Sequence, residues 1–387
     1  MINKKEPIDE LYLVRTLAII GVIMVHSTSF IVLNLNQSST YWPLYNFLNI
    51  FFKFGTPTFI FLSSIVLFYN YFDRPIDKKL IRTFYSRRML YIILPYLLFS
   101  VLYSILLIVN NSWLNWSYLY TDVPQRILEG RAYTHLYFVY ISIQFYILFP
   151  LFLYICQKSR WVTRNLIWLG ILIQWGFVLY NHYYLGYTRT GSLSIWYFSY
   201  YFIGAYIGIY YKDVVGWLKV KRENLLTKKA LFWFPLWGLW IASALAHVYL
   251  WYIVRTASAV VDTKIYTLLW NVHTLTTAIV LLQISYWIYA KWSPKIINTM
   301  IHLGVVSFGV YLFHPFILYY YRMIEFGGNP VVYHLSVVGG FLSALLGSWI
   351  VVGLTMRYLK WSWWIFGAIP RSMPYMKKRE EVKKEVA

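Results

Sequence analysis

The sequence predicts an all-α integral membrane protein, because of its composition, its ten long apolar stretches and the one-sided distribution of its basic residues. Of the 387 residues, 59% are hydrophobic and only 13% are charged. This composition is typical of proteins that cross a bilayer several times and excludes an ordinary soluble domain. We therefore expect a multi-pass protein of the cell membrane.

Ten apolar stretches have the length of about 20 residues that a helix needs to cross the hydrocarbon core. They lie at residues 11–31, 45–70, 89–109, 135–156, 164–183, 194–211, 231–254, 266–290, 300–321 and 332–356. We treat residues 1–356 as one membrane domain of about ten transmembrane helices, and 357–387 as a basic cytoplasmic tail.

The basic residues indicate the orientation of these helices. With the N-terminus inside, 27 of the 35 Lys and Arg residues fall on the inner side, six fall outside, and Arg15 and Lys53 lie within spans. Cytoplasmic loops carry such an excess, so both termini are expected to be cytoplasmic. The net charge of +21 thus reflects topology, and nucleic acid is not an expected partner. The tail at 377–385 could pair with anionic membrane lipid.

The first apolar stretch carries two ionisable residues within it. Arg15 and His26 are eleven residues apart, about three helical turns, and so share one face. Ionisable groups in a membrane helix usually face a bundle interior or an aqueous cavity, which makes the pair a candidate site. Alternatively, Arg15 snorkels to the headgroups and His26 only packs, although His26 lies too deep to snorkel.

The ninth stretch carries a second histidine. Ser307, Tyr311 and His314 are spaced four and three residues apart, so they share one helix face. His26 and His314 each lie about 21 Å into a core of roughly 30 Å. Two histidines at matching depth could meet in one cavity, although depth alone does not place them together.

Two further features interrupt or flank the spans. Gly55 and Pro57 break the second stretch directly after Lys53, which we interpret as a kink with a snorkelling lysine. Arg82, Arg87 and Arg88 form a basic segment before the third stretch. Arginine suits bidentate phosphate recognition, although positive-inside topology also produces such clusters.

These motifs resemble the membrane acyltransferase 3 family. The resemblance begins with Glu10, Arg15 and His26, and continues in Phe-Gly-Thr-Pro, Ile-Leu-Pro-Tyr, Phe-Ile-Gly-Ala-Tyr and Tyr-Leu-Phe-His-Pro at residues 54–57, 93–96, 202–206 and 311–315. The resemblance covers nearly the whole chain. Within the family, the chain is most similar to the intercellular adhesion protein C branch, whose members modify or handle poly-N-acetylglucosamine in Gram-positive bacteria. The chain departs from the family in having Ser63-Ser64 for the usual Ser-Gly, and Arg87-Arg88 for an Arg-x-x-Arg.

The resemblance implies an enzyme that moves an acyl group, such as acetyl or succinyl, from cytoplasmic acyl-CoA to a hydroxyl of an envelope glycan or exopolysaccharide. Acyl-CoA would be a co-substrate, with no bound cofactor and no metal. His26 would be the catalytic base, helped by Arg15 and Glu10, and Arg82, Arg87 and Arg88 would hold the donor.

The residue types agree with this chemistry. Histidine titrates near neutral pH, which suits a base that takes the proton of a sugar hydroxyl. Tyr311, Ser307 or backbone amides near Gly55 could donate to the developing oxyanion, and His314 is the second candidate base.

Two other functions stay open at this point. Buried ionisable groups also mark transport pathways, so a polysaccharide exporter or flippase without covalent chemistry is the main alternative. The other is an accessory protein whose partner is a glycan synthase. Loss of an acyl ester with continued export, when His26 is changed, would distinguish the enzyme from the exporter.

Overall fold

The computed structural model of the chain describes residues 5–112, 114–257, 259–326, 329–368, 370 and 372–376. Every regular element in these residues is helical, and nine helices are long and apolar enough to cross a membrane. The predicted fold class is confirmed: this is an all-α, multi-pass protein of the cell membrane. The side on which each terminus lies stays a prediction, and the basic segment at 377–385 lies outside the described residues.

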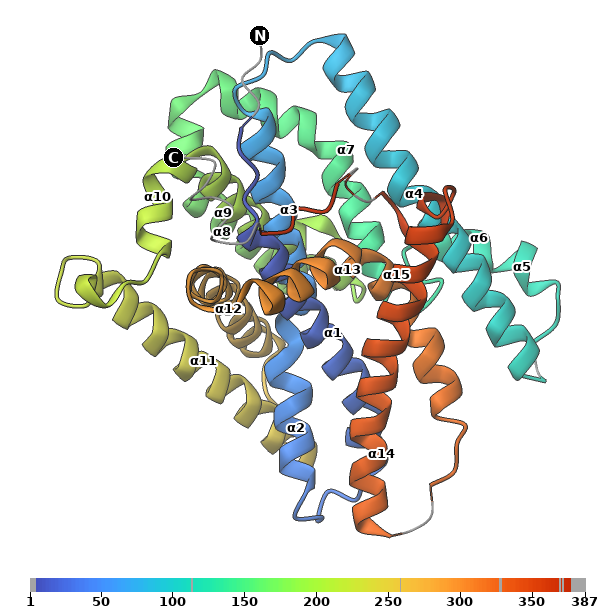
Figure 1. Cartoon of the computed structure of the whole chain (residues 1–387). Helices are drawn as coiled ribbons and strands as arrows, with labels where there is room; N and C mark the ends of the chain where they lie inside the picture. The colour runs from blue at the N-terminus through green and yellow to red at the C-terminus, as the bar shows by residue number, and fades with distance from the viewer. Residues whose placement is uncertain are drawn as a thin grey trace. The chain divides into compact units, whose positions relative to one another are not determined.

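The described helices form two compact units. Figure 1 shows these helices coloured by residue number. The first unit comprises residues 63–211 and 352–368, and the second comprises 5–62, 212–351 and the described residues from 370. Helices α3 (Gly55–Tyr71) and α15 (Ser348–Tyr358) each run from one unit into the other.

The first unit is built on long helices with aromatic packing between them. It holds α4 (Lys78–Asn110), α5 (Tyr118–Thr121), α6 (Val123–Leu128), α7 (Tyr137–Lys158), α8 (Arg160–Tyr180), the π-helix η2 (Asn181–Leu185), the 3-10 turns η3 (Thr190–Ser192) and η4 (Ser194–Tyr197), α9 (Phe198–Ile209) and α16 (Trp363–Phe366). Asp77 caps α4 by accepting a hydrogen bond of 2.6 Å from the Leu80 N–H. Phe145 of α7 stacks on Tyr201 of α9, with ring centroids 4.1 Å apart.

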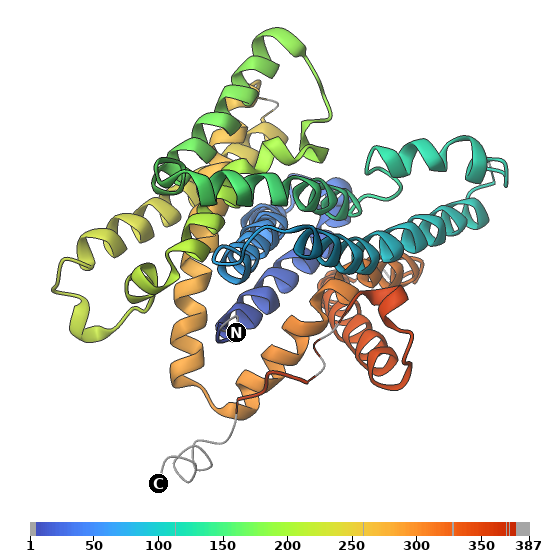
Figure 2. The same cartoon turned by 90° about the horizontal axis from the view of Figure 1, so that it is seen from above.

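The second unit contains the first and ninth predicted spans. Its elements are α1 (Glu10–Asn34), α2 (Trp42–Phe51), the 3-10 turn η1 (Phe52–Phe54), α10 (Tyr211–Leu218), the 3-10 turn η5 (Arg222–Asn224), α11 (Ala230–Thr256), α12 (Thr263–Lys291), α13 (Pro294–Tyr321), α14 (Pro330–Leu342) and the π-helix η6 (Ser343–Gly347). Figure 2 shows α1 lying between α12 and α13, and α11 packs along α12.

The register between α1 and α13 is set by a close approach of their backbones. A Cβ atom at Gly304 would collide with the carbonyl oxygen of Tyr12, so only glycine permits this spacing. Four residues along α1, the hydroxyl of Thr16 donates to the carbonyl of Met300 at 2.5 Å. Beyond this crossing, α1 carries His26 and α13 carries His314.

The predicted break in the second span is confirmed, slightly earlier than expected. The α-helix gives way to the 3-10 turn η1 at Phe52–Phe54, directly before Gly55. A Cβ atom at Gly55 would lie 3.0 Å from the carbonyl oxygen of Ala18, so the turn packs directly on α1.

The predicted count of about ten spans is reduced by one stretch. Residues 194–211 do not form one long helix, since η4 is followed by α9, which has only 12 residues. The first turn of α9 is held against the neighbouring helix α8, because the N–H of Ser199 donates to Oε1 of Gln174 at 2.9 Å. Apolar composition alone does not show where such a helix begins and ends.

Candidate active site

The structure brings the two predicted histidines together. The ring centroids of His26 on α1 and His314 on α13 are 5.1 Å apart, with their planes inclined by 60°. His26 is half-buried, whereas His314 is fully buried. The structure therefore places a partly exposed imidazole directly beside an enclosed one.

A backbone contact orients His314. Its Nδ1 lies 3.2 Å from the carbonyl oxygen of Val310, and a carbonyl oxygen can only accept. The neutral ring therefore carries its proton on Nδ1, which makes Nε2 the basic nitrogen. Such a fixed tautomer is what a histidine needs to act in proton transfer.

The other two predicted residues of α13 lie on the same helix below His314. The ring centroid of Tyr311 is 5.9 Å from that of His314, so its phenol belongs to the site. Ser307 is two turns away and its hydroxyl donates to the carbonyl of Gly304 at 2.8 Å. This bond uses the only proton that Ser307 can donate, which makes Ser307 a poor candidate for stabilising an oxyanion.

Arg322 ties the end of α13 to α1 beside the histidines. Its Nη2 donates to the carbonyl oxygen of His26 at 2.5 Å, and its guanidinium carbon lies 5.6 Å from the ring centroid of Phe30. In the sequence, Arg322 is only one of the six basic residues that the predicted topology places on the outer side. Its hydrogen bond to the His26 carbonyl joins residues far apart in the chain, so it exists only in the folded structure.

Glu10 and Arg15 lie at the other end of α1. Arg15 is half-buried, with its guanidinium carbon 5.8 Å from the ring centroid of Tyr12. Glu10 begins the helix, about 24 Å below His26 at 1.5 Å per residue. The two predicted residues therefore lie near the N-terminal end of the helix that carries His26, away from the histidine pair.

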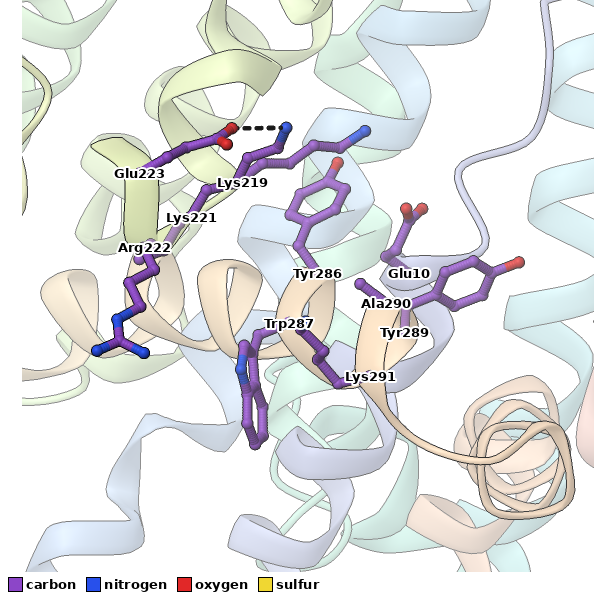
Figure 3. A pocket seen from close by; sticks show the side chains of 11 residues that line it. Glu10, Lys219, Lys221, Arg222, Glu223, Tyr286, Trp287, Tyr289, Ala290 and Lys291 are labelled. Carbon is purple, nitrogen blue, oxygen red and sulfur yellow. Dashed lines mark hydrogen bonds and ion pairs between the residues drawn. The ribbon is translucent and has the colours of Figure 1, made fainter. Parts of the chain in front are cut away.

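Glu10 lines a large basic cavity of about 850 Å³ (Figure 3). Lys219, Lys221, Arg222 and Lys291 supply its positive charge, and Tyr286 and Trp287 of α12 supply aromatic surface. Lys221 pairs with Glu223 at 3.1 Å, while the ammonium of Lys219 lies 5.4 Å from the ring centroid of Tyr286. Figure 3 shows Glu10, Tyr286 and Lys219 pointing to the same side.

This cavity combines four cationic and two anionic side chains with aromatic rings, an arrangement that the sequence motifs did not predict. Lysine and arginine side chains bind phosphates, and an aromatic ring can stack on a base. A signal for it exists in the sequence, because the segment 212–229 carries six basic residues. Positive-inside topology explains that cluster equally well, so the sequence does not separate the two roles.

The arginines predicted to bind the donor lie on the first turns of α4, in the first unit. Arg82 and Arg87 are exposed. Arg88 is half-buried, and its guanidinium carbon lies 5.9 Å from the ring centroid of Tyr146. Their role in donor binding stays a prediction.

A second polar cluster in the second unit involves Lys53 and two more histidines. His247 Nδ1 lies 3.1 Å from His273 Nδ1, and the indole N–H of Trp251 donates to His247 Nε2 at 3.2 Å. The charged atoms of Lys53 and Arg255 lie 4.4 and 4.7 Å from the Trp251 ring centroid. Lys53 thus packs against an aromatic ring, in addition to lying beside the kink that the sequence predicts.

This cluster is linked to the helix turn that carries His26. Arg255 donates to the side-chain oxygens of Asn46 at 3.0 Å and Asn49 at 3.4 Å. Asn49 in turn donates to the carbonyl of Val25 at 3.2 Å. The network therefore holds α1 from the side of α2 and α11, while Arg322 holds it from α13.

Comparison with known proteins agrees with a membrane protein of the acyltransferase class. Residues 8–353 match the model of a family described as "Acyltransferase domain". A Staphylococcus aureus (strain N315) protein is 26% identical over 336 residues, covering 83% of each chain. A Staphylococcus epidermidis protein is 26% identical over 392 residues, covering 96% of each chain.

Both relatives are named "Probable poly-beta-1,6-N-acetyl-D-glucosamine export protein". No solved structure matches the chain. The histidine pair and the basic cavity lie within the residues that the family model covers, and that model spans most of the sequence. The chain therefore belongs to the membrane acyltransferase 3 family.

Proposed function

We propose that this protein is an O-acyltransferase that moves an acyl group from acyl-CoA to a hydroxyl of an exported or envelope polysaccharide. The observation that carries the proposal is the contact between His26 and His314 on adjacent membrane-spanning helices, with ring centroids 5.1 Å apart. The basic cavity at the Glu10 end of α1 supports it, since CoA carries several phosphates. Family membership supports the reaction class.

In the proposed reaction, the nucleotide part of acyl-CoA binds among Lys219, Arg222 and Lys291, and the pantetheine arm follows α1 past Arg15. His26 takes the proton of the sugar hydroxyl as its oxygen attacks the thioester carbon. Tyr311 donates to the carbonyl oxygen as negative charge develops there. The C–S bond then breaks, the CoA thiolate takes the proton from His26, and the glycan ester is released with CoA–SH.

The relatives' printed name supports a second candidate, a polysaccharide exporter without covalent chemistry. The cluster of Lys53, His247, His273 and Arg255 is a specific observation in its favour, since polar groups at membrane depth also line transport pathways. The two candidates differ in whether the glycan gains an ester.

The test is to replace His26 and to measure ester formation and export on the same cells. His26→Ala should accumulate normally in the membrane and reduce ester formation by about 10²–10⁴-fold, which is the usual contribution of a general base. His26→Gln should restore packing without restoring the rate. The glycan ester is measured by mass analysis of the secreted and envelope polysaccharide.

A matched control is His334→Gln, since His334 is also a histidine of the second unit but packs against Tyr41 and Tyr45. This variant should retain normal ester formation. Near wild-type esterification by His26→Ala would eliminate His26 as the base and make His314 the next candidate. Loss of export with no ester on the wild-type glycan would favour the exporter.

A further inference from the structure

A smaller cavity opens beside the histidine pair, on the side away from Glu10. Its volume is about 180 Å³ and its walls come from α1, from the end of α13 with the residues that follow it, and from α14. Leu318, one of its lining residues, follows His314 by four positions on α13. The cavity therefore begins about 6 Å, one helical turn, beyond the level of His314.

Aromatic side chains form much of the cavity wall. Phe30, Tyr321, Phe326 and Tyr333 all line it. Tyr321 is held in place, because its hydroxyl donates to the carbonyl of Ser336 at 2.9 Å. Its ring also packs so close to Gly340 that a Cβ atom there would lie 3.1 Å away. The wall is therefore preformed.

Two polar residues, Ser27 and Arg322, line the cavity together with these aromatic side chains. The hydroxyl of Ser27, directly after His26, is buried and has no hydrogen-bond partner among the described residues. A buried polar group without a partner is unfavourable, so a ligand that supplies one is stabilised. Arg322 also lines the cavity, and a guanidinium with five N–H donors can hold the His26 carbonyl and a ligand oxygen together.

We propose that this cavity binds one sugar ring of the polysaccharide acceptor and selects rings that carry no positive charge. The proposal rests on the acyl transfer proposed above. The cavity is smaller than the roughly 300–1,000 Å³ of pockets for drug-sized ligands, so it suits a single ring. The apolar face of a pyranose packs against Tyr321 and Tyr333, while its hydroxyls face Ser27 and Arg322.

The charge of Arg322 sets the selectivity. The free amino group of an amino sugar is cationic at neutral pH and would meet a like charge in this cavity. A hydroxyl, an amide carbonyl or a carboxylate accepts a hydrogen bond from the guanidinium instead. The predicted acceptors are therefore neutral or acidic hexose units, including N-acylated amino sugars.

Val337 and Val338 offer a matched pair of variants for the test. Val337 lines the cavity, whereas Val338 is 53% exposed and lies outside it. The full-length protein in lipid nanodiscs, without acyl-CoA, is titrated with the trisaccharide of N-acetylglucosamine and with its fully deacetylated form. Val337→Phe should weaken binding of the acetylated trisaccharide by about tenfold or more, because the added ring fills the cavity. Val338→Phe should change it by less than about twofold.

Two further variants keep the test independent of packing. Ser27→Ala adds no volume and should weaken binding of the acetylated trisaccharide several-fold, while Arg322→Gln should remove the preference for it over the deacetylated form. Equal binding to the Val337→Phe and Val338→Phe proteins would overturn the proposal. The proposal would also be overturned if the Val337→Phe protein bound a spin-labelled phospholipid more weakly than wild type but bound the trisaccharide equally well.

The outcome is separable from that of the acyltransferase proposal. Sugar binding that depends on Val337 without any ester formation would support the cavity and refute acyl transfer. Ester formation whose dependence on acceptor concentration is unchanged in Val337→Phe would refute the cavity and leave acyl transfer standing.

Discussion

Replacing Lys219 and Arg222 with Gln should weaken the binding of CoA. Both side chains line the basic cavity of about 850 Å³ at the Glu10 end of α1. Lys221 is already paired with Glu223 at 3.1 Å, so it has less charge to offer to a ligand. We therefore expect the double variant at 219 and 222 to have a larger effect than Lys221→Gln.

The expected size of the effect follows from the energy of the two ionic hydrogen bonds that the variant removes. A hydrogen bond to a charged group contributes about 1.5–3 kcal/mol, so removing two of them costs about 3 kcal/mol or more. That corresponds to roughly 150-fold in Kd. Both side chains are exposed at an open site, where solvent weakens ionic interactions, so we expect about ten- to a hundredfold.

The assay is a titration of the purified protein with CoA and with dephospho-CoA at two ionic strengths. The difference in affinity between wild type and variant should shrink at high salt, because exposed charges are screened. It should also be smaller for dephospho-CoA, which carries less charge. Lys228→Gln is the control, since Lys228 lies in the same basic segment, is exposed, and does not line the cavity.

Two results would refute this reasoning. Equal CoA affinity in the double variant and in Lys228→Gln would show that the basic cavity does not hold the donor. A large drop in affinity in the Arg87→Gln, Arg88→Gln double variant, with none at Lys219 and Arg222, would place the donor on the α4 arginines that the sequence predicts.

Three further predictions concern Arg15, the membrane topology and the ion pairs of Glu129. Arg15→Lys should lower ester formation at least about tenfold if the contact with the donor is bidentate, because lysine lacks the guanidinium fork; unchanged activity in a membrane-vesicle assay would exclude that contact. Reporter fusions at Asn115 and at the C-terminus should read outside and inside, and the same side for both would contradict the predicted orientation. Hydrogen bonds from Gln125 and Arg131, and the ion pairs with Arg131 and Arg189, lower the pKa of Glu129. Its contribution to stability is therefore full above the ordinary carboxyl pKa and is lost as pH falls through the lowered value, so the Tm difference between wild type and Glu129→Gln should vanish in acid and persist at pH 7.

Local sequence pattern determines much of this protein. Helical periodicity is enough to place Arg15 and His26 on one membrane-spanning helix, and to place Tyr311 and His314 on another at a matching depth. The length of the apolar stretches predicts the spans, because a continuous apolar segment of about 20 residues satisfies its backbone polar groups in a bilayer by forming a helix. The stretch 194–211 does not form the single long helix that its apolar length predicts. The start of α9 is instead fixed by a hydrogen bond to Gln174, a residue distant in sequence.

Tertiary packing decides which of these residues meet. His26 and His314 are in contact because Gly304 lets α13 approach the backbone of α1 and because Thr16 sets their register on Met300. Nothing local to either helix specifies that pairing.

The two cavities and the second polar cluster arise in the same way. Lys219, Tyr286 and Glu10 come from three separate segments and form a cavity only when those segments pack. His247 and His273 likewise become a pair through the α11–α12 interface. The sequence alone determines which residues each helix offers and at what depth, whereas the choice of neighbouring helix depends on contacts between residues far apart in the chain. Those contacts decide where the chemistry can take place.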